Sequence, residues 1–221
     1  MVRITPNFYM IFPILMLTAC GNVGGINLAK YKYENESSDE YVMCHGYGCT
    51  HRTYSGFTSK QWKNVRAIFE APYDTAQDER VRIAKAIGLM EKYSGALIGT
   101  HNDLPKAPIF KTSNYELDCI DETVNTSKYL KFMDDDNLFK YHMLGRPAYR
   151  GIGVSLMYPH NTATIVEKKS KQTYVVDSYI YANGVQPDIR KVGDWLSTRI
   201  EDKEKQTIPV MIKPKRKPKR I

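Results

Sequence analysis

The feature that most constrains the fold is a change of hydrophobic pattern partway along the chain. Up to about residue 137 the apolar residues recur at helical spacing, and beyond it they occur in short runs rich in β-branched and aromatic residues. Helices followed by strands predict an α+β domain, in which N-terminal helices pack on a C-terminal antiparallel β-sheet. Apolar residues make up 42% of the chain, which is enough for a buried core.

Three helices are predicted in the first part of the chain. The first two run from Thr58 to Phe69 and from Thr75 to Tyr93, where Gly95 is expected to end the second. The third runs from Cys119 to Met133. The second helix carries an apolar stripe that we expect to lie in the core: Val81, Ile83, Ile87 and Met90.

Short strands separated by polar turns are predicted in the second part. The segment 168–172 is polar and turn-like, so the strands on either side of it are expected to form a hairpin with position 160 opposite a residue between 177 and 179. A short helix over Val192–Ile200 and an edge strand over Ile208–Ile212 should follow. The three predicted strands before them are Gly151–Tyr158, Thr162–Glu167 and Thr173–Tyr181.

The N-terminus has the pattern of an export signal. Arg3 precedes an apolar run over Phe8–Leu17, which is shorter than the ~20 residues that span a bilayer. The run ends in Leu-Thr-Ala-Cys, which resembles the bacterial lipobox, so residues 1–19 are predicted to be a signal peptide and Cys20 to be lipidated. The alternative is an uncleaved anchor with an incidental cysteine. A lipidated Cys20 would hold the protein at a membrane of the cell envelope, facing the periplasm or the cell surface.

Composition divides the rest of the chain into three parts. Residues 20–40 are polar and are expected to form a flexible tether, residues 41–212 the folded domain, and residues 213–221 a basic disordered tail. The tail carries most of the net charge of +8, so no specific nucleic-acid partner is expected for the domain. The tail is either a solvated end or a segment that adheres to an anionic surface.

The four cysteines are expected to have different roles. Cys44 and Cys49 lie in Cys-His-Gly-Tyr-Gly-Cys, and in an exported protein such a close pair predicts a disulfide. A zinc site that also uses His45 and His51 is the alternative, although the usual two-residue spacing between cysteines is missing. Disulfide pairing leaves Cys119 as an odd thiol in an oxidising compartment, which marks it as a candidate reactive residue. Neither a metal nor a cofactor is expected.

Cys119 lies at the predicted start of the third helix. A thiolate there faces unpaired backbone N–H groups and the positive end of the helix dipole, which stabilise it. The carboxylates of Asp118, Asp121 and Glu122 would oppose this effect if they pointed toward the sulfur, but they are also suited to capping the helix.

His160 and Asp177 are candidates for the base and the orienting group. His160 lies where one predicted strand begins, and Asp177 lies on the next strand, in Tyr-Val-Val-Asp. Neighbouring strands bring opposing side chains within about 5 Å, so Asp177 is expected to hold the imidazole while its other nitrogen faces Cys119.

The stretch Asp-Cys-x-Asp, followed by a strand-borne His and a Val-Val-Asp strand, resembles the transglutaminase-like superfamily of papain-type cysteine hydrolases. It is similar in particular to the bacterial transglutaminase-like cysteine proteinases, over roughly residues 75–190. The resemblance implies a papain-like fold, a catalytic triad of Cys119, His160 and Asp177, and acyl transfer on a protein or peptide substrate without a cofactor. Hydrolysis of peptide or amide bonds is the expected outcome, and transamidation is an alternative.

A non-catalytic envelope lipoprotein that uses the same fold for binding or assembly is the competing interpretation. The reactivity of the Cys119 thiol distinguishes the two, because a catalytic cysteine alkylates rapidly at neutral pH.

Overall fold

A computed structural model of the chain describes residues 26–32, 35–106, 114–151 and 159–197. The predicted lipidation site Cys20, the edge strand Ile208–Ile212 and the basic tail lie outside these residues, as does almost all of the predicted strand Gly151–Tyr158. Within the described residues, no helix has both the length and the apolar character needed to cross a membrane.

The helices begin where capping residues precede apolar periodicity. Thr58 accepts a hydrogen bond from the backbone N–H of Gln61, whose side chain accepts one in return, and Thr75 caps the next helix by accepting one from the N–H of Asp78. Asp118 caps the third. The described helices are a 3-10 turn, η1 (Leu28–Tyr31), and four α-helices: α1 (Ser59–Glu70), α2 (Ala76–Ile98), α3 (Cys119–Asp135) and α4 (Val192–Ser197).

Two predictions about α2 are wrong. The helix continues through Gly95 and ends at Gly99, which has the left-handed φ of 92° that suits glycine. Gly95 instead allows the side chain of Asn183 to pack closely against the helix, because a β-carbon at position 95 would lie 2.6 Å from Oδ1 of Asn183. Val81 is 42% exposed, since it lies at the edge of the predicted stripe, whereas the other members of that stripe, Ile83, Ile87 and Met90, are fully buried.

The strands form a two-stranded hairpin and a larger antiparallel sheet. In the sheet the order is β3-β5-β6-β7, and β4 also pairs with β5. Every strand pair among the described residues is antiparallel, so the chain has the predicted α+β architecture of helices and antiparallel sheet. The strands are β1 (Tyr41–His45), β2 (His51–Ser55), β3 (His142–Leu144), β4 (Ala148–Arg150), β5 (His160–Glu167), β6 (Thr173–Asp177) and β7 (Asp188–Lys191).

The sheet differs from the prediction mainly at the ends of strands. β5 starts at His160, two residues earlier than expected, and β6 stops at Asp177 because the chain turns, with the N–H of Tyr181 bonding the carbonyl of Ser178. β1, β2, β3, β4 and β7 were not predicted, since they are short and four of the five residues of β2 are exposed. The β5–β6 pairs run from Val166 opposite Thr173 to Ala163 opposite Val176, and beyond them the rings of His160 and Tyr179 lie 5.0 Å apart, inside the expected range.

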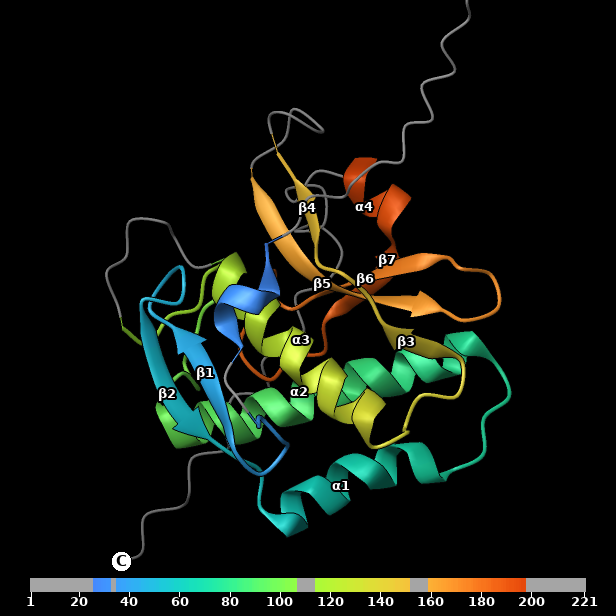
Figure 1. The fold of residues 1–221 in the computed structure, drawn as a ribbon, viewed down its shortest axis with the longest axis horizontal. Coiled ribbons are helices and arrows are strands. Elements are labelled where there is room, and N and C mark those ends of the chain that lie inside the picture. The colour runs from blue at the N-terminus through green and yellow to red at the C-terminus, as the bar shows by residue number, and fades with distance from the viewer. Residues whose placement is uncertain (1–25, 33–34, 107–113, 152–158, 198–221) are drawn as a thin grey trace, which may run out of the picture.

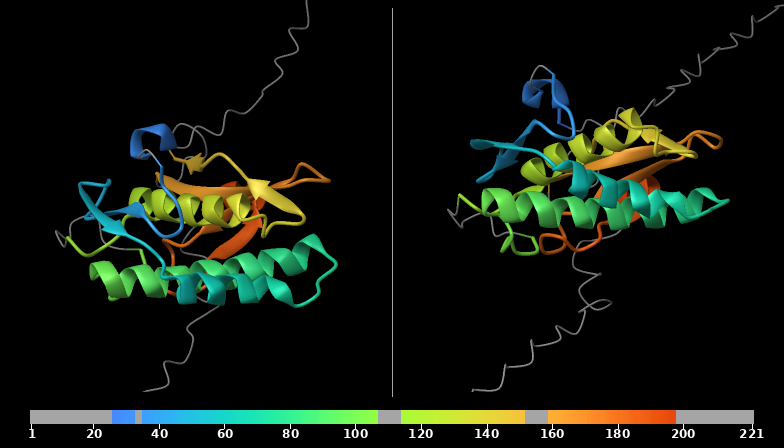
Figure 2. Two further views of the ribbon diagram at one scale, coloured as in Figure 1. Left: turned by 60° about the horizontal axis from the view of Figure 1, so that its bottom comes forward. Right: turned by 90° about the horizontal axis from the view of Figure 1, so that it is seen from below.

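Helix α3 lies at the centre of the molecule. It contacts β5 of the sheet, β1 of the hairpin and α2, and α1 packs on α2 (Figures 1 and 2). One large apolar cluster joins these elements. Twelve residues of α3 are buried, so the helix that begins with Cys119 has little freedom to move.

Part of the predicted tether, residues 26–31, packs on the domain. The N–H of Ile26 bonds Oδ1 of Asn161, and Ile26, Leu28 and Tyr31 contact the small apolar cluster that contains Val124. Residues 26–31 therefore lie against α3 and the start of β5, as the blue segment in Figure 1 shows.

Candidate catalytic site

Cys119 is the first residue of α3, as predicted, and its side chain is partly exposed. The side chain of Asp118 accepts hydrogen bonds from the N–H groups of Ile120 and Asp121, and Asp121 accepts one from the N–H of Asp118. This reciprocal cap leaves the thiol at the positive end of the helix dipole and accessible to a reactant.

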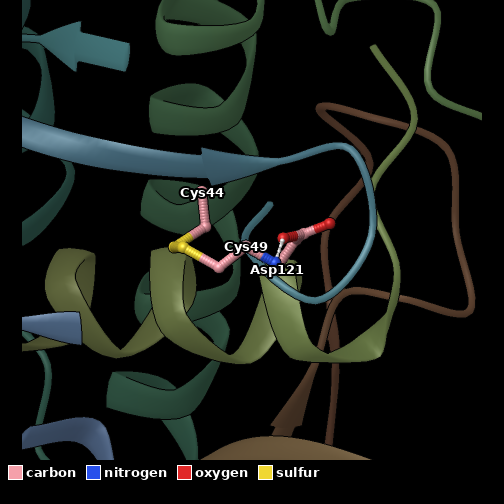
Figure 3. A group of neighbouring side chains, drawn as sticks. All are labelled: Cys44, Cys49 and Asp121. Atoms are coloured by element: carbon pink, nitrogen blue, oxygen red, sulfur yellow. Dashed lines mark hydrogen bonds between the residues drawn. A yellow bond between two sulfur atoms is a disulfide. The ribbon is translucent and has the colours of Figure 1, made fainter. Parts of the chain in front are cut away.

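A disulfide-closed loop braces the same helix end. Cys44 and Cys49 form the predicted disulfide, and the four residues from Gly46 to Cys49 all have left-handed φ values between 60° and 76°. The backbone N–H groups of Tyr47 and Cys49 donate to the carboxylate of Asp121, and Figure 3 shows the bond from Cys49.

The zinc alternative does not fit this geometry. Cys44, Cys49 and Asp121 do lie close enough to resemble a ligand set, but the two sulfur atoms are bonded to each other and are not thiolates. His45 is also engaged, with Nδ1 close to the carbonyl of Asn114 and Nε2 to the hydroxyl of Thr53.

The structure brings His160 and Asp177 together at one end of the sheet. Nε2 of His160 lies 3.0 and 2.9 Å from the two carboxylate oxygens of Asp177, and both side chains are almost fully buried. Because β5 begins at one residue and β6 ends at the other, two adjacent antiparallel strands fix the position of both.

Two further residues hold this pair, and the sequence analysis did not identify them. The indole N–H of Trp195 donates to Asp177 at 2.9 Å, and its ring packs 5.6 Å from that of His160. Arg150 in turn lies over the Trp195 ring and donates to its carbonyl oxygen. A tryptophan in the predicted helix after the Asp177 strand was the only signal, and it gave no indication of which strand the helix would cover.

The ionisation of the pair follows from this environment. Burial alone would lower the pKa of His160, but the charge and hydrogen bond of Asp177, together with those of Cys119, raise that pKa to about 9. Burial would likewise raise the pKa of Asp177, but His160, Trp195 and Arg150 hold it below its ordinary value. At neutral pH the pair is therefore an imidazolium and a carboxylate.

Cys119 lies close enough to His160 to affect the pKa of its imidazole. Nδ1 of His160 is buried and makes no complete hydrogen bond with the described residues. The sulfur of Cys119 nevertheless interacts with the imidazole strongly enough to raise its pKa. Since Asp177 occupies Nε2, Nδ1 is the nitrogen left for the thiol.

Three carboxyl groups lie near Cys119 in the chain, and their environments limit how strongly their negative charge would destabilise a thiolate there. Burial, together with the charges of nearby carboxylates, raises the pKa of Glu122 well above its ordinary value and so disfavours its charged form. Burial and the nearby charge of Asp118 raise the pKa of Asp121 to about 7. Asp118 itself faces the backbone N–H groups of the cap and that of Gly48.

A second buried histidine–carboxylate pair provides an internal comparison. Nδ1 of His142 lies 2.7 Å from Glu79, and Nε2 lies 3.2 Å from Arg80, so both ring nitrogens are engaged. Glu79 also accepts the backbone N–H groups of Lys140 and Tyr141. This pair anchors β3 to α2, whereas the His160 pair has a ring nitrogen left beside a thiol.

Comparison with protein-family models, with curated proteins and with solved structures finds no match to this chain. The geometry of the site is therefore the basis for its interpretation.

Proposed function

We propose that the chain is a thiol acyl-transfer enzyme, which hydrolyses peptide or amide bonds through Cys119, His160 and Asp177. One observation carries the proposal: a buried imidazole is held by a carboxylate at Nε2, and a partly exposed thiol at a helix N-terminus interacts with the same imidazole. The resemblance to transglutaminase-like cysteine proteinases is part of the same proposal. It is supported by a cysteine at a helix start and by a His and an Asp on paired consecutive strands.

In the proposed reaction the Cys119 thiolate attacks the carbonyl carbon of the substrate, and the π electrons pass to the oxygen. Collapse of this adduct breaks the C–N bond while the His160 imidazolium gives its Nδ1 proton to the leaving amine. The thioester and a neutral imidazole remain. Water then adds to the thioester carbonyl while Nδ1 of His160 takes a proton from the water. The C–S bond breaks, the carboxylic acid leaves, and the Cys119 thiolate and the His160 imidazolium are restored.

The protein is proposed to act in the cell envelope, anchored by lipid at Cys20. The disulfide between Cys44 and Cys49 supports this location, because such bonds persist in oxidising compartments. A protein or peptide of that compartment is the proposed substrate.

The proposal can be tested with p-nitrophenyl acetate, an activated ester that needs no specific recognition. We expect rapid acetylation of Cys119, located by peptide mass spectrometry, followed by turnover. Cys119→Ser should abolish the rapid phase, and His160→Asn should slow it by at least ~100-fold.

His142→Asn is the matched control, because His142 is also buried beside a carboxylate but has no thiol partner, and it should retain the reaction. Acetylation of Cys119 that is unaffected by His160→Asn, or no acetylation at all, would reject the enzyme and favour a binding role for the fold.

A further inference from the structure

A cavity of about 830 Å³ lies beside α3, apart from the residues of the proposed triad. Residues of the segments 26–32 and 35–36 form one wall, α3 forms another, and residues 144–147, from the end of β3 to the start of β4, form a third. In Figure 1 the ribbon of η1, which contributes to the first wall, lies over that of α3. Its volume falls within the ~300–1,000 Å³ range of small-molecule sites.

The floor of the cavity is apolar. Val124 is 1% exposed, and Pro147 is also buried. Ile26, Leu28 and Leu144 extend this apolar surface along the walls. Such a surface favours a hydrocarbon chain over a polar ligand of the same size.

A polar atom in the same cavity has no partner. Ser127 is only 5% exposed, and its buried hydroxyl makes no hydrogen bond with the described residues. Buried polar groups nearly always have a hydrogen-bond partner, so the unpaired hydroxyl of Ser127 indicates a ligand atom that would accept its hydrogen bond.

The cavity also has an excess of positive charge at its rim. Lys32 and Arg146 are exposed and make no ion pair with the described residues. Of the acidic wall residues, Glu36 pairs with Lys128 and Asp135 with Lys131, whereas Asp134 accepts the N–H of Leu144 and keeps its charge, so four lining cations exceed three carboxylates by one.

We propose that this cavity binds a single-chain anionic amphiphile, with its alkyl chain on the apolar floor and its head group between Lys32 and Arg146. The Ser127 hydroxyl would donate to an oxygen of that head group. A carboxylate fits these contacts, because it is anionic and accepts several hydrogen bonds at once. The site is independent of the proposed chemistry at Cys119.

The test is isothermal titration of the full-length chain with decanoate below its micelle concentration, and with decyltrimethylammonium as the cation of similar length. We expect decanoate to bind more tightly. Lys32→Glu with Arg146→Glu should weaken decanoate binding by roughly tenfold, since two favourable charges become repulsive.

The matched control is Lys63→Glu with Lys85→Glu, which reverses two exposed lysines on α1 and α2 and should leave binding unchanged. Ser127→Ala should weaken binding severalfold without altering any surface charge. Equal binding of the two amphiphiles, decanoate binding that survives the rim reversal, or an equal loss in the control would each overturn the proposal.

Discussion

Replacement of Asp177 by asparagine should change how the stability of the protein depends on pH. The carboxylate is the main reason that the pKa of buried His160 rises to about 9, because burial alone lowers it. The asparagine side chain has nearly the same shape as the aspartate but no charge. The variant keeps the burial of His160 and loses the Asp177 charge, so only Cys119 still opposes the effect of burial and the pKa of His160 should fall.

The sign and size of this pH dependence follow from the linkage between proton binding and folding. A histidine with a raised folded pKa contributes stability that is complete below pH 6.5 and is lost as the pH rises through about 9. One pH unit corresponds to about 1.4 kcal/mol, so the interval from 6.5 to about 9 amounts to about 3 kcal/mol. The wild type should have a higher free energy of unfolding than Asp177→Asn, and this difference should be about 3 kcal/mol larger at pH 6.5 than at pH 10.

Urea unfolding of both proteins across this pH range measures the difference. Asp136→Asn is the control, because Asp136 pairs with Arg66 at the surface and the pKa of its carboxyl lies below its ordinary value. That variant should differ from the wild type by the same amount at every pH tested. If the gap for Asp177→Asn were also constant from about pH 6.5 to about pH 10, Asp177 would not control the ionisation of His160.

Three further changes test the support of the site. Trp195→Phe removes the indole N–H that bonds the triad carboxylate and should lower the free energy of unfolding by about 1–3 kcal/mol in urea; no change would mean that the bond is dispensable. Replacing Cys44 and Cys49 together by serine should cost about 2 kcal/mol, and the wild type in reductant should unfold at the same lower temperature as the variant. Gly99→Ala should cost about 1 kcal/mol at its φ of 92°, whereas Gly193→Ala, which meets open space, should not destabilise; equal effects would contradict the capping role.

The parts of the site that depend on local pattern were predictable. Asp118 before Cys119 is a helix-capping sequence, and the polar turn between β5 and β6 brings His160 and Asp177 together in any hairpin of that length. Both inferences depend only on residues that lie near one another in the chain or on paired strands. The catalytic roles of the three residues stay a prediction.

The residues that were missed depend on contacts between distant parts of the chain. Trp195 bonds a carboxylate on β6, and Arg150 on β4 reaches its ring, but no periodicity links these positions. The end of α2 was misplaced for a similar reason. Gly95 looks like a terminator in the sequence, whereas its lack of a side chain makes room for Asn183.

The central claim is that His160 activates the Cys119 thiol, and the rate of Cys119 alkylation by iodoacetamide at neutral pH tests it most directly. With site-resolved mass spectrometry, wild-type Cys119 should react rapidly at neutral pH. In His160→Asn the same reaction should be slow, while His142→Asn should behave as the wild type. Equal rates for wild type and His160→Asn would contradict the account.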